Sequence, residues 1–161
     1  MNPGTEQIFT SAGGDVVIDT SSCVADGDGA TSAVCELAAA WTTDRPDEYA
    51  WTCEALFQDG TVLGETLDLY LAGTNSTGTY YDGGITASNA SFTDSDRLKN
   101  LMFIGSVIVT DATEETEFAS GVCRIISNKV ILVVWNNTTG AMSATGTNFE
   151  FGLTPIPVAV Q

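Results

Sequence analysis

The side chains available for chemistry are carboxylates and thiols, because the chain holds 21 Asp and Glu, four Cys and no His. Without imidazole it lacks the usual general base, the Ser-His-Asp and Cys-His arrangements and the commonest transition-metal ligand. Two carboxylates on either side of a sugar bond suffice for glycoside hydrolysis, so that chemistry remains formally open. With so many acids, close pairs arise by chance in almost any fold. We therefore predict no catalytic residue and no enzymatic activity.

One acidic segment resembles the start of a calcium-binding loop. In Asp26-Gly27-Asp28-Gly29 alternate carboxylates are spaced so that they can converge on a hard cation. A helix-loop-helix calcium loop beginning at Asp26 needs a bidentate Glu at its twelfth position, where this sequence has Leu37. We therefore expect a tight turn with solvated carboxylates, and no metal or other cofactor.

The cysteines show no spacing typical of a metal site. None of them forms a C-x-x-C pair, and zinc patterns that use His are ruled out by composition. In a reducing cytoplasm the sequence predicts free thiols that pack as small hydrophobic groups, and the alternative is disulfides formed later outside a cell. The residues concerned are Cys23, Cys35, Cys53 and Cys123.

The charge balance restricts the possible partners. The formal net charge is −16, from 5 Lys and Arg against 21 Asp and Glu spread along the chain. Phosphate backbones and anionic lipids bind clustered Lys and Arg, which are missing, so we expect neither nucleic acid nor membrane as a partner. The charge suits solubility at high local concentration, and the alternative use is attachment to a basic or metal-bridged partner.

No targeting or membrane segment is expected. Residues 1–6 lack a basic segment followed by an apolar core, so they do not predict a secretory signal. The longest apolar runs, around 101–109 and 130–135, have the length of strands. The sequence predicts a protein made in soluble form in a cytoplasm.

The elements that position these side chains are predicted to be strands. Segments of alternating polarity recur about every ten residues, separated by Gly, Asp, Asn, Ser and Thr, which is typical of an antiparallel sandwich or barrel. We predict one all-β domain over residues 1–161, an antiparallel, jelly-roll-like β-sandwich of eight to ten strands. Residues 1–14 are expected to form an N-terminal arm and residues 154–161 an extended C-terminal tail, since Pro cannot donate to a ladder.

The first half of the chain carries two alternating patterns. In 48–57 every second residue is apolar and is predicted to face inward; these are Tyr49, Trp51, Cys53, Ala55 and Phe57. In 66–71 the inward set is Leu67, Leu69 and Leu71, with Asp68 and Tyr70 outward. The Asp59-Gly60 dipeptide between them is typical of a hairpin turn. Residues 33–41 suit a strand or a short helix, and we favour the strand.

The second half is more apolar. Residues 101–110 and 129–135 predict central strands with both faces covered, because Val and Ile occupy consecutive positions. Further strands are predicted at 117–126 and at 148–153, where Phe149, Phe151 and Leu153 share a face. Residues 73–96 are dense in Gly, Asn, Ser and Thr and predict a long ordered surface loop that carries aromatic plugs, namely Tyr80, Tyr81 and Phe92.

Four segments between Asp82 and Gln161 carry a resemblance to a known family. They are DGG at 82–84, LKNLMFIGSVIV at 98–109, VVWNNTTGA at 133–141 and FGLTPIP at 151–157. In order and spacing they resemble small virion structural proteins of tailed bacteriophages, whereas the N-terminal half matches only in general character. The resemblance implies a β-sandwich that assembles with other particle proteins, and it supplies no active-site residue.

The combined expectation is a capsid decoration, or cement, protein that stabilises a phage head and resides in the virion. Its expected partners are the major capsid protein or other virion proteins, and a homotrimer would match the three-fold sites of a shell. A tail or fibre component is the structural alternative. The alternative of another class is a carbohydrate-binding β-sandwich module that uses Tyr80 and Tyr81 for stacking.

Overall fold

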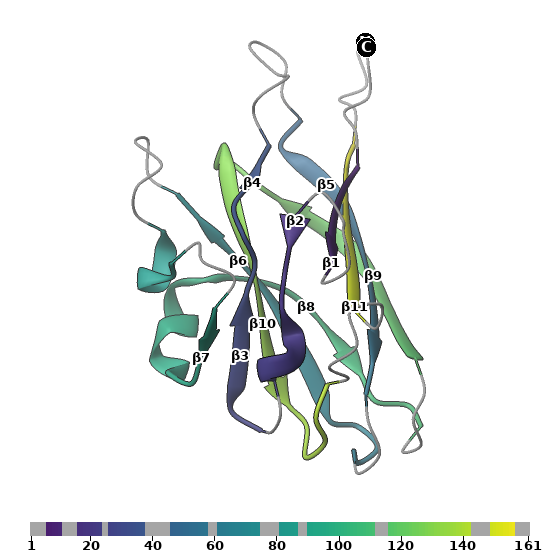
Figure 1. The fold of residues 1–161 in the computed structure, drawn as a ribbon. Coiled ribbons are helices and arrows are strands. Elements are labelled where there is room, and N and C mark those ends of the chain that lie inside the picture. The colour runs from purple at the N-terminus through teal and green to yellow at the C-terminus, as the bar shows by residue number, and fades with distance from the viewer. Residues whose placement is uncertain are drawn as a thin grey trace.

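The computed structural model describes residues 6–10, 16–23, 26–37, 46–57, 61–74, 81–86, 90–111, 116–142 and 149–156. These residues form two β-sheets packed face to face (Figure 1). The first sheet has the order β2 (Val16–Val17), β1 (Gln7–Thr10), β11 (Phe149–Pro155), β5 (Glu48–Leu56) and β9 (Thr116–Arg124). The second has the order β7 (Ser91–Phe92), β3 (Asp28–Thr31), β10 (Lys129–Asn137), β6 (Thr66–Gly73) and β8 (Met102–Ile108), and β4 (Cys35–Glu36) also pairs with β10.

The path of the chain is that of a jelly roll. Among the strands of four or more residues, β1, β5, β9 and β11 belong to the first sheet and β3, β6, β8 and β10 to the second. The chain therefore changes sheet at every step except from β6 to β8, as in the double Greek keys of jelly rolls. The predicted antiparallel, jelly-roll-like sandwich is confirmed. Eleven strands are present in the described residues, more than predicted, because three have only two residues.

The main core lies between the two sheets. The inward residues predicted for 48–57 are confirmed, with exposed fractions of 4% or less for Tyr49, Trp51, Cys53, Ala55 and Phe57. Leu67, Leu69 and Leu71 of β6 are also buried on this side. Phe151 of β11 is fully buried, with its ring centroid 5.5 Å from that of Phe9 and 6.1 Å from that of Trp51. These alternating patterns thus position both sheets.

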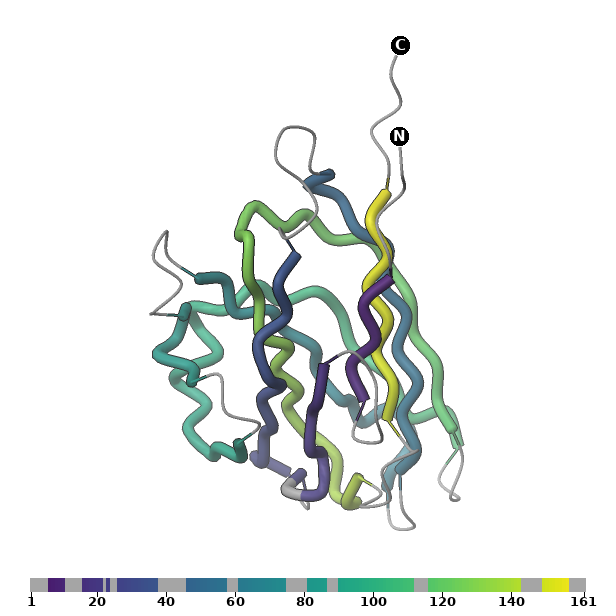
Figure 2. The backbone as a smooth tube through the Cα atoms, turned by 45° about the horizontal axis from the view of Figure 1, so that its top comes forward, coloured from purple at the N-terminus to yellow at the C-terminus, as the bar shows by residue number. Residues whose placement is uncertain are grey.

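A second, smaller core lies on the outer face of the second sheet. Residues 81–86 and 90–101 lie on this face and include β7 and two short 3-10 helices, η2 (Asp82–Gly84) and η3 (Ser95–Asn100), on the side away from the first sheet (Figures 1 and 2). Tyr81 and Phe92 pack there against Ile131 and Val133 of β10. The predicted aromatic plugs are confirmed for these two residues, and Tyr80 lies outside the described residues. Strand β10 is consequently buried on both faces, as predicted.

Two predictions about strand neighbours are wrong. Strands β5 and β6 lie in different sheets, so the connection that contains Asp59-Gly60 is not a hairpin; the dipeptide itself lies outside the described residues. The segment 101–110 forms β8, which is an edge strand and not a central one, and its Phe103 and Ile108 are more than half exposed. The consecutive apolar residues of this segment therefore belong to an edge strand whose outer side chains are exposed, and not to a strand buried on both faces.

The boundaries of both ends also differ from the prediction. Residues 7–10 of the expected arm form β1, which pairs with β11, and Phe9 is fully buried. Thr154 and Pro155 of the expected tail belong to β11, and the N–H of Ile156 donates to the carbonyl of Glu48 at 2.9 Å. Within 33–41 the structure forms only β4, and residues 38–41 lie outside the described part of the chain.

We predict that Phe151→Ala lowers the free energy of unfolding by about 3–5 kcal/mol, because it opens a cavity between two aromatic rings. Val62→Ala, at a side chain that is 55% exposed, is the control and should change it by less than about 0.5 kcal/mol. Urea titrations at one protein concentration measure both values. Equal losses for the two variants would contradict the assignment of Phe151 to the core.

Candidate functional site

The two sheets differ in what covers their outer faces. The chain itself covers part of the outer face of the second sheet with residues 81–86 and 90–101, whereas no described segment lies over the outer face of the first sheet (Figure 2). On this open face Phe118 and Val122 of β9 are 71% and 63% exposed. Exposed apolar side chains gathered in one region mark a surface for contact with another molecule.

The strands β8 and β9 form neighbouring edges of the two sheets. The indole of Trp51 fills the space between them, and Gly105 and Gly121 make room for it. A Cβ placed on Gly105 would lie 2.5 Å, and one on Gly121 2.8 Å, from the indole ring. The indole N–H of Trp51 has no hydrogen-bond partner among the described residues. The ring therefore separates the two edges, and β8 and β9 form no ladder with each other.

Apolar side chains flank this separated edge from both sides. We use the name edge surface for the exposed large hydrophobic residues of β8, of β9 and of the turn that follows β9. They are Phe103, Ile108, Phe118, Val122 and Ile126. Ile126 is the most exposed of them, at 84%. On a chain of net charge −16, such a grouping is the best candidate for a functional surface.

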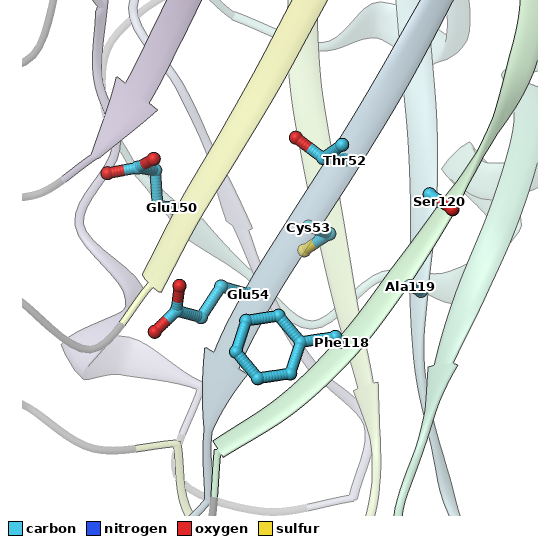
Figure 3. A pocket seen from close by; sticks show the side chains of 7 residues that line it. All are labelled: Thr52, Cys53, Glu54, Phe118, Ala119, Ser120 and Glu150. Atoms are coloured by element: carbon cyan, nitrogen blue, oxygen red, sulfur yellow. The ribbon is translucent and has the colours of Figure 1, made fainter.

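An open pocket of about 380 Å³ adjoins the edge surface on the outer face of the first sheet (Figure 3). Its polar side chains come from adjacent strands at paired positions: Thr52 lies opposite Ser120, and Glu54 lies opposite both Phe118 and Glu150. The ring of Phe118 lies beside Glu54 in Figure 3. The pocket thus combines an exposed aromatic ring with two carboxylates.

The two carboxylates of this pocket form no built catalytic or metal site. No described residue donates a hydrogen bond to Glu54 or Glu150, and like charges directly opposite on neighbouring strands repel. No group of three or more potential metal ligands occurs within the described residues. A two-carboxylate hydrolase would need a pair of acids fixed by hydrogen bonds, and Glu54 and Glu150 are not such a pair.

A second pocket, of about 450 Å³, lies at the end of the sandwich beside Ile126. Its charged groups already have partners. Asp82 accepts the N–H of Gly73 at 3.0 Å, and Arg124 pairs with Asp47 at 2.6 Å. This pocket has no free charged group among the described residues with which to select a ligand.

The carboxylate of Glu117 secures the connection between β8 and β9. It is 7% exposed and accepts the N–H of Thr110 at 2.6 Å, the hydroxyl of Thr110 at 2.8 Å and the N–H of Asp111 at 3.0 Å. Burial by itself raises the pKa of Glu117, but these hydrogen bonds outweigh it and hold the pKa below its usual value. The ionised carboxylate therefore fixes both edges relative to each other.

A half-buried carboxylate has a similar role directly before β6, at the same end of the sandwich. Glu65 accepts the N–H of Val62 and the N–H of Thr139, each at 2.9 Å. The bond from Val62 lowers the pKa of Glu65, desolvation opposes this shift, and the bonds from Thr139 add to the lowering. Acidic residues thus join loops of the sandwich at two places.

The thiols lie in the core. All four cysteines are free and buried, as predicted from the sequence. Burial raises the pKa of Cys23 to about 12 and that of Cys123 to about 11, and it also raises the pKa of Cys53. Thiols of this kind hold their protons at neutral pH and are poor nucleophiles and metal ligands.

The remaining sequence candidates have structural positions. Asp26 and Gly27 form a turn in which Gly27 has a φ of +90° and donates its N–H to the carbonyl of Asn136. Trp51 and Trp135 are buried, so neither offers a ring face for sugar stacking. Tyr81, one of the two tyrosines proposed for that purpose, packs partly buried in the second core.

Sequence reasoning did not identify the edge surface. Its signal was present in 116–124, where apolar residues occupy both sets of alternating positions, with Phe118 and Val122 in one set and Ala119 and Cys123 in the other. A strand that is covered on one face needs apolar residues in only one of the two alternating sets. The second apolar set in 116–124 was therefore the signal of an exposed apolar face.

Comparison with known proteins yields similar folds but no relative. No family model and no curated protein matches the chain. The crystal structure of murine APRIL at pH 8.0 is similar with 11% identity and a TM-score of 0.44, covering 94% of this chain and 98% of that one. Eiger TNF from S. frugiperda has 10% identity and a TM-score of 0.39, covering 74% and 65%.

A third similar structure comprises the CBM22-1 and GH10 modules of Clostridium thermocellum xylanase 10B complexed with xylohexaose. It has 16% identity and a TM-score of 0.44, covering 98% of this chain and 25% of that one. TM-scores below 0.5 at such low identity assign neither a family nor a function to this chain. No helix in the described residues is both long and apolar enough to span a bilayer.

We predict that Glu117→Gln lowers the free energy of unfolding at neutral pH by about 1–3 kcal/mol, because charge-assisted hydrogen bonds become neutral ones. The folded-state pKa of Glu117 lies below its unfolded value, so its contribution is complete above the unfolded pKa and is lost as pH falls through the folded pKa. Urea titrations at neutral pH and at a pH below the folded-state pKa of Glu117 measure the free energy of unfolding of both proteins. The difference between variant and wild type should vanish in acid. Glu48→Gln, at an exposed side chain, should have little effect, and a pH-independent loss for Glu117→Gln would contradict the mechanism.

We also predict that the native thiols resist alkylation. At mildly alkaline pH, iodoacetamide should modify the folded protein slowly and all four cysteines rapidly after unfolding, because only unfolding exposes them. Mass spectrometry counts the modified sites. Rapid modification of the folded chain, or fewer than four thiols after unfolding without reductant, would contradict buried free cysteines.

Proposed function

We propose that this chain is a virion structural protein, and specifically a capsid decoration protein that stabilises the head of a tailed bacteriophage. The observation that carries the proposal is the edge surface, a group of exposed apolar side chains on a strongly acidic sandwich. Such a surface serves contact with other proteins, while the charge keeps the chain soluble before assembly. The resemblance of 82–157 to phage virion proteins is the source of the particle assignment.

The proposed partners are the major capsid protein or other virion proteins, together with further copies of this chain. A homotrimer matches the three-fold and quasi-three-fold positions of an icosahedral shell. A tail or fibre position remains the structural alternative, and it differs in copy number.

The experiment that tests the proposal is electron microscopy of purified particles with an antibody against the chain. Many labels spread over the head are expected. Labels confined to the tail or fibres would favour the structural alternative, and particles without label would overturn the assignment to a virion.

A carbohydrate-binding module is the alternative of another class. A glycan array with millimolar sugar separates it from the assembly role, since weak sugar binding is detected at that concentration. Reproducible binding that is lost in both Tyr80→Ala and Tyr81→Ala would favour the sugar-binding function. No binding is expected for a decoration protein.

A further inference from the structure

We propose that β9 pairs antiparallel with β9 of a second copy of this chain, about a two-fold axis at Ser120. The first sheet of one copy then continues into the first sheet of the other. This inference goes beyond the proposed function, because the pairing is a property of the isolated chain. It would hold in a virion or outside one.

The first observation is that β9 has backbone groups, on the side away from β5, for which its own sheet supplies no partner strand. The strand pairs with β5 in nine consecutive positions, from Thr116 to Arg124, and ends the first sheet. The N–H of Ile125 donates to the carbonyl of Asp47, one position beyond that register. Because hydrogen-bonded pairs alternate along an antiparallel ladder, the N–H and C=O groups of Phe118, Ser120 and Val122 point away from β5.

The second observation is that the other sheet edges are protected. Strands β2 and β7 end the sheets opposite β9 and β8, and each has only two residues. Strand β8 has an irregular register with β6 between Leu69 and Tyr70. Short strands and bulges are the means by which proteins prevent edge pairing, and β9, long and regular, has neither.

Third, the sequence of β9 is complementary to itself. Ser120 is the central residue of the strand, so an antiparallel copy places Phe118 opposite Val122 of the second copy, and Val122 opposite its Phe118. An aromatic ring opposite a β-branched side chain is a favourable cross-strand pair. Ser120 lies opposite Ser120 of the second copy, and all three pairs are of the hydrogen-bonded kind.

Fourth, the charge distribution permits two acidic copies to approach here. Between Phe118 and Val122 the exposed face of β9 has no charge, and Glu117 on the other face is occupied by Thr110 and Asp111. The nearest acid on that face of β5, Glu54, would lie about 14 Å from β5 of the second copy, three strand spacings away. This exceeds the Debye length of about 8 Å at physiological salt, so the repulsion is largely screened.

The test is the mass of the purified chain in solution, measured by light scattering or sedimentation over a concentration series. The wild type should form particles with an even number of copies, and Ser120→Pro should halve the mass. Proline removes an N–H that the pairing uses and the monomer does not, and prolines are tolerated on edge strands at such positions. Ser120→Ala is the matched control and should keep the wild-type mass.

Phe118→Lys together with Val122→Lys provides a second variant, since both side chains are exposed in the monomer. It should also halve the mass, with an unchanged circular dichroism spectrum. A wild type that remains a monomer, or forms only trimers, overturns the pairing; trimers alone would leave the proposed capsid function intact. If both variants kept the mass of the wild-type assembly, the contact between copies would lie elsewhere, and the proposed β9 pairing would be overturned too.

Cross-linking tests the register. In a hydrogen-bonded antiparallel pair the Cα atoms lie about 5.5 Å apart, so a short bifunctional maleimide can join two thiols placed there. Ser120→Cys should therefore give a covalent dimer with this reagent, while the buried native thiols do not react. Ile126→Cys, exposed but far from its own copy in this register, should give none. Equal dimer yields from both variants would contradict the proposed pairing.

Discussion

The insertion of Trp51 between two sheet edges is the contact on which the exposed edge of this sandwich depends. The indole occupies the space beside Gly105 and Gly121, where any larger residue would collide with it. The neighbouring strands β8 and β9 are therefore held apart and cannot form a ladder that would close the sandwich into a barrel. Two edge strands with apolar side chains are the direct consequence.

Acidic residues contribute both to the surface charge and to the shape of this edge. Most of the 21 carboxylates contribute to a net charge of −16, which gives a long-range repulsion between copies of the chain. Glu117 instead uses its charge inside the fold, where backbone N–H donors from Thr110 and Asp111 compensate for its burial. The same residue type thus supplies long-range repulsion and local order, and the difference lies in the donors that surround each side chain.

The alternation of apolar residues was sufficient to predict the strands and their inward faces, as in Tyr49 to Phe57 and in Phe149 to Leu153. It was not sufficient to predict neighbours. Burial on two faces and exposure at an apolar edge produce the same run of hydrophobic residues, so β8 was expected at the centre of a sheet. The turn signal of Asp59-Gly60 is local, whereas the assignment of β5 and β6 to different sheets depends on contacts distant in sequence. The edge surface was missed for the same reason, since exposure depends on which strands fail to acquire a neighbour.

The outer face of the second sheet is partly covered by the chain and that of the first sheet is not, which indicates that the first sheet is the surface available to a second molecule. Covering an outer face takes an additional segment of chain such as residues 81–86 and 90–101, which place Ile85 and Leu98 over β10. The first sheet has no equivalent among the described residues, although its last strand carries two large apolar side chains in water. Solvating such groups costs free energy that a monomer does not recover, and a second molecule removes that cost on binding. An edge that retains free backbone donors and acceptors adds direction to this attraction, because hydrogen bonds fix register where apolar contact alone does not.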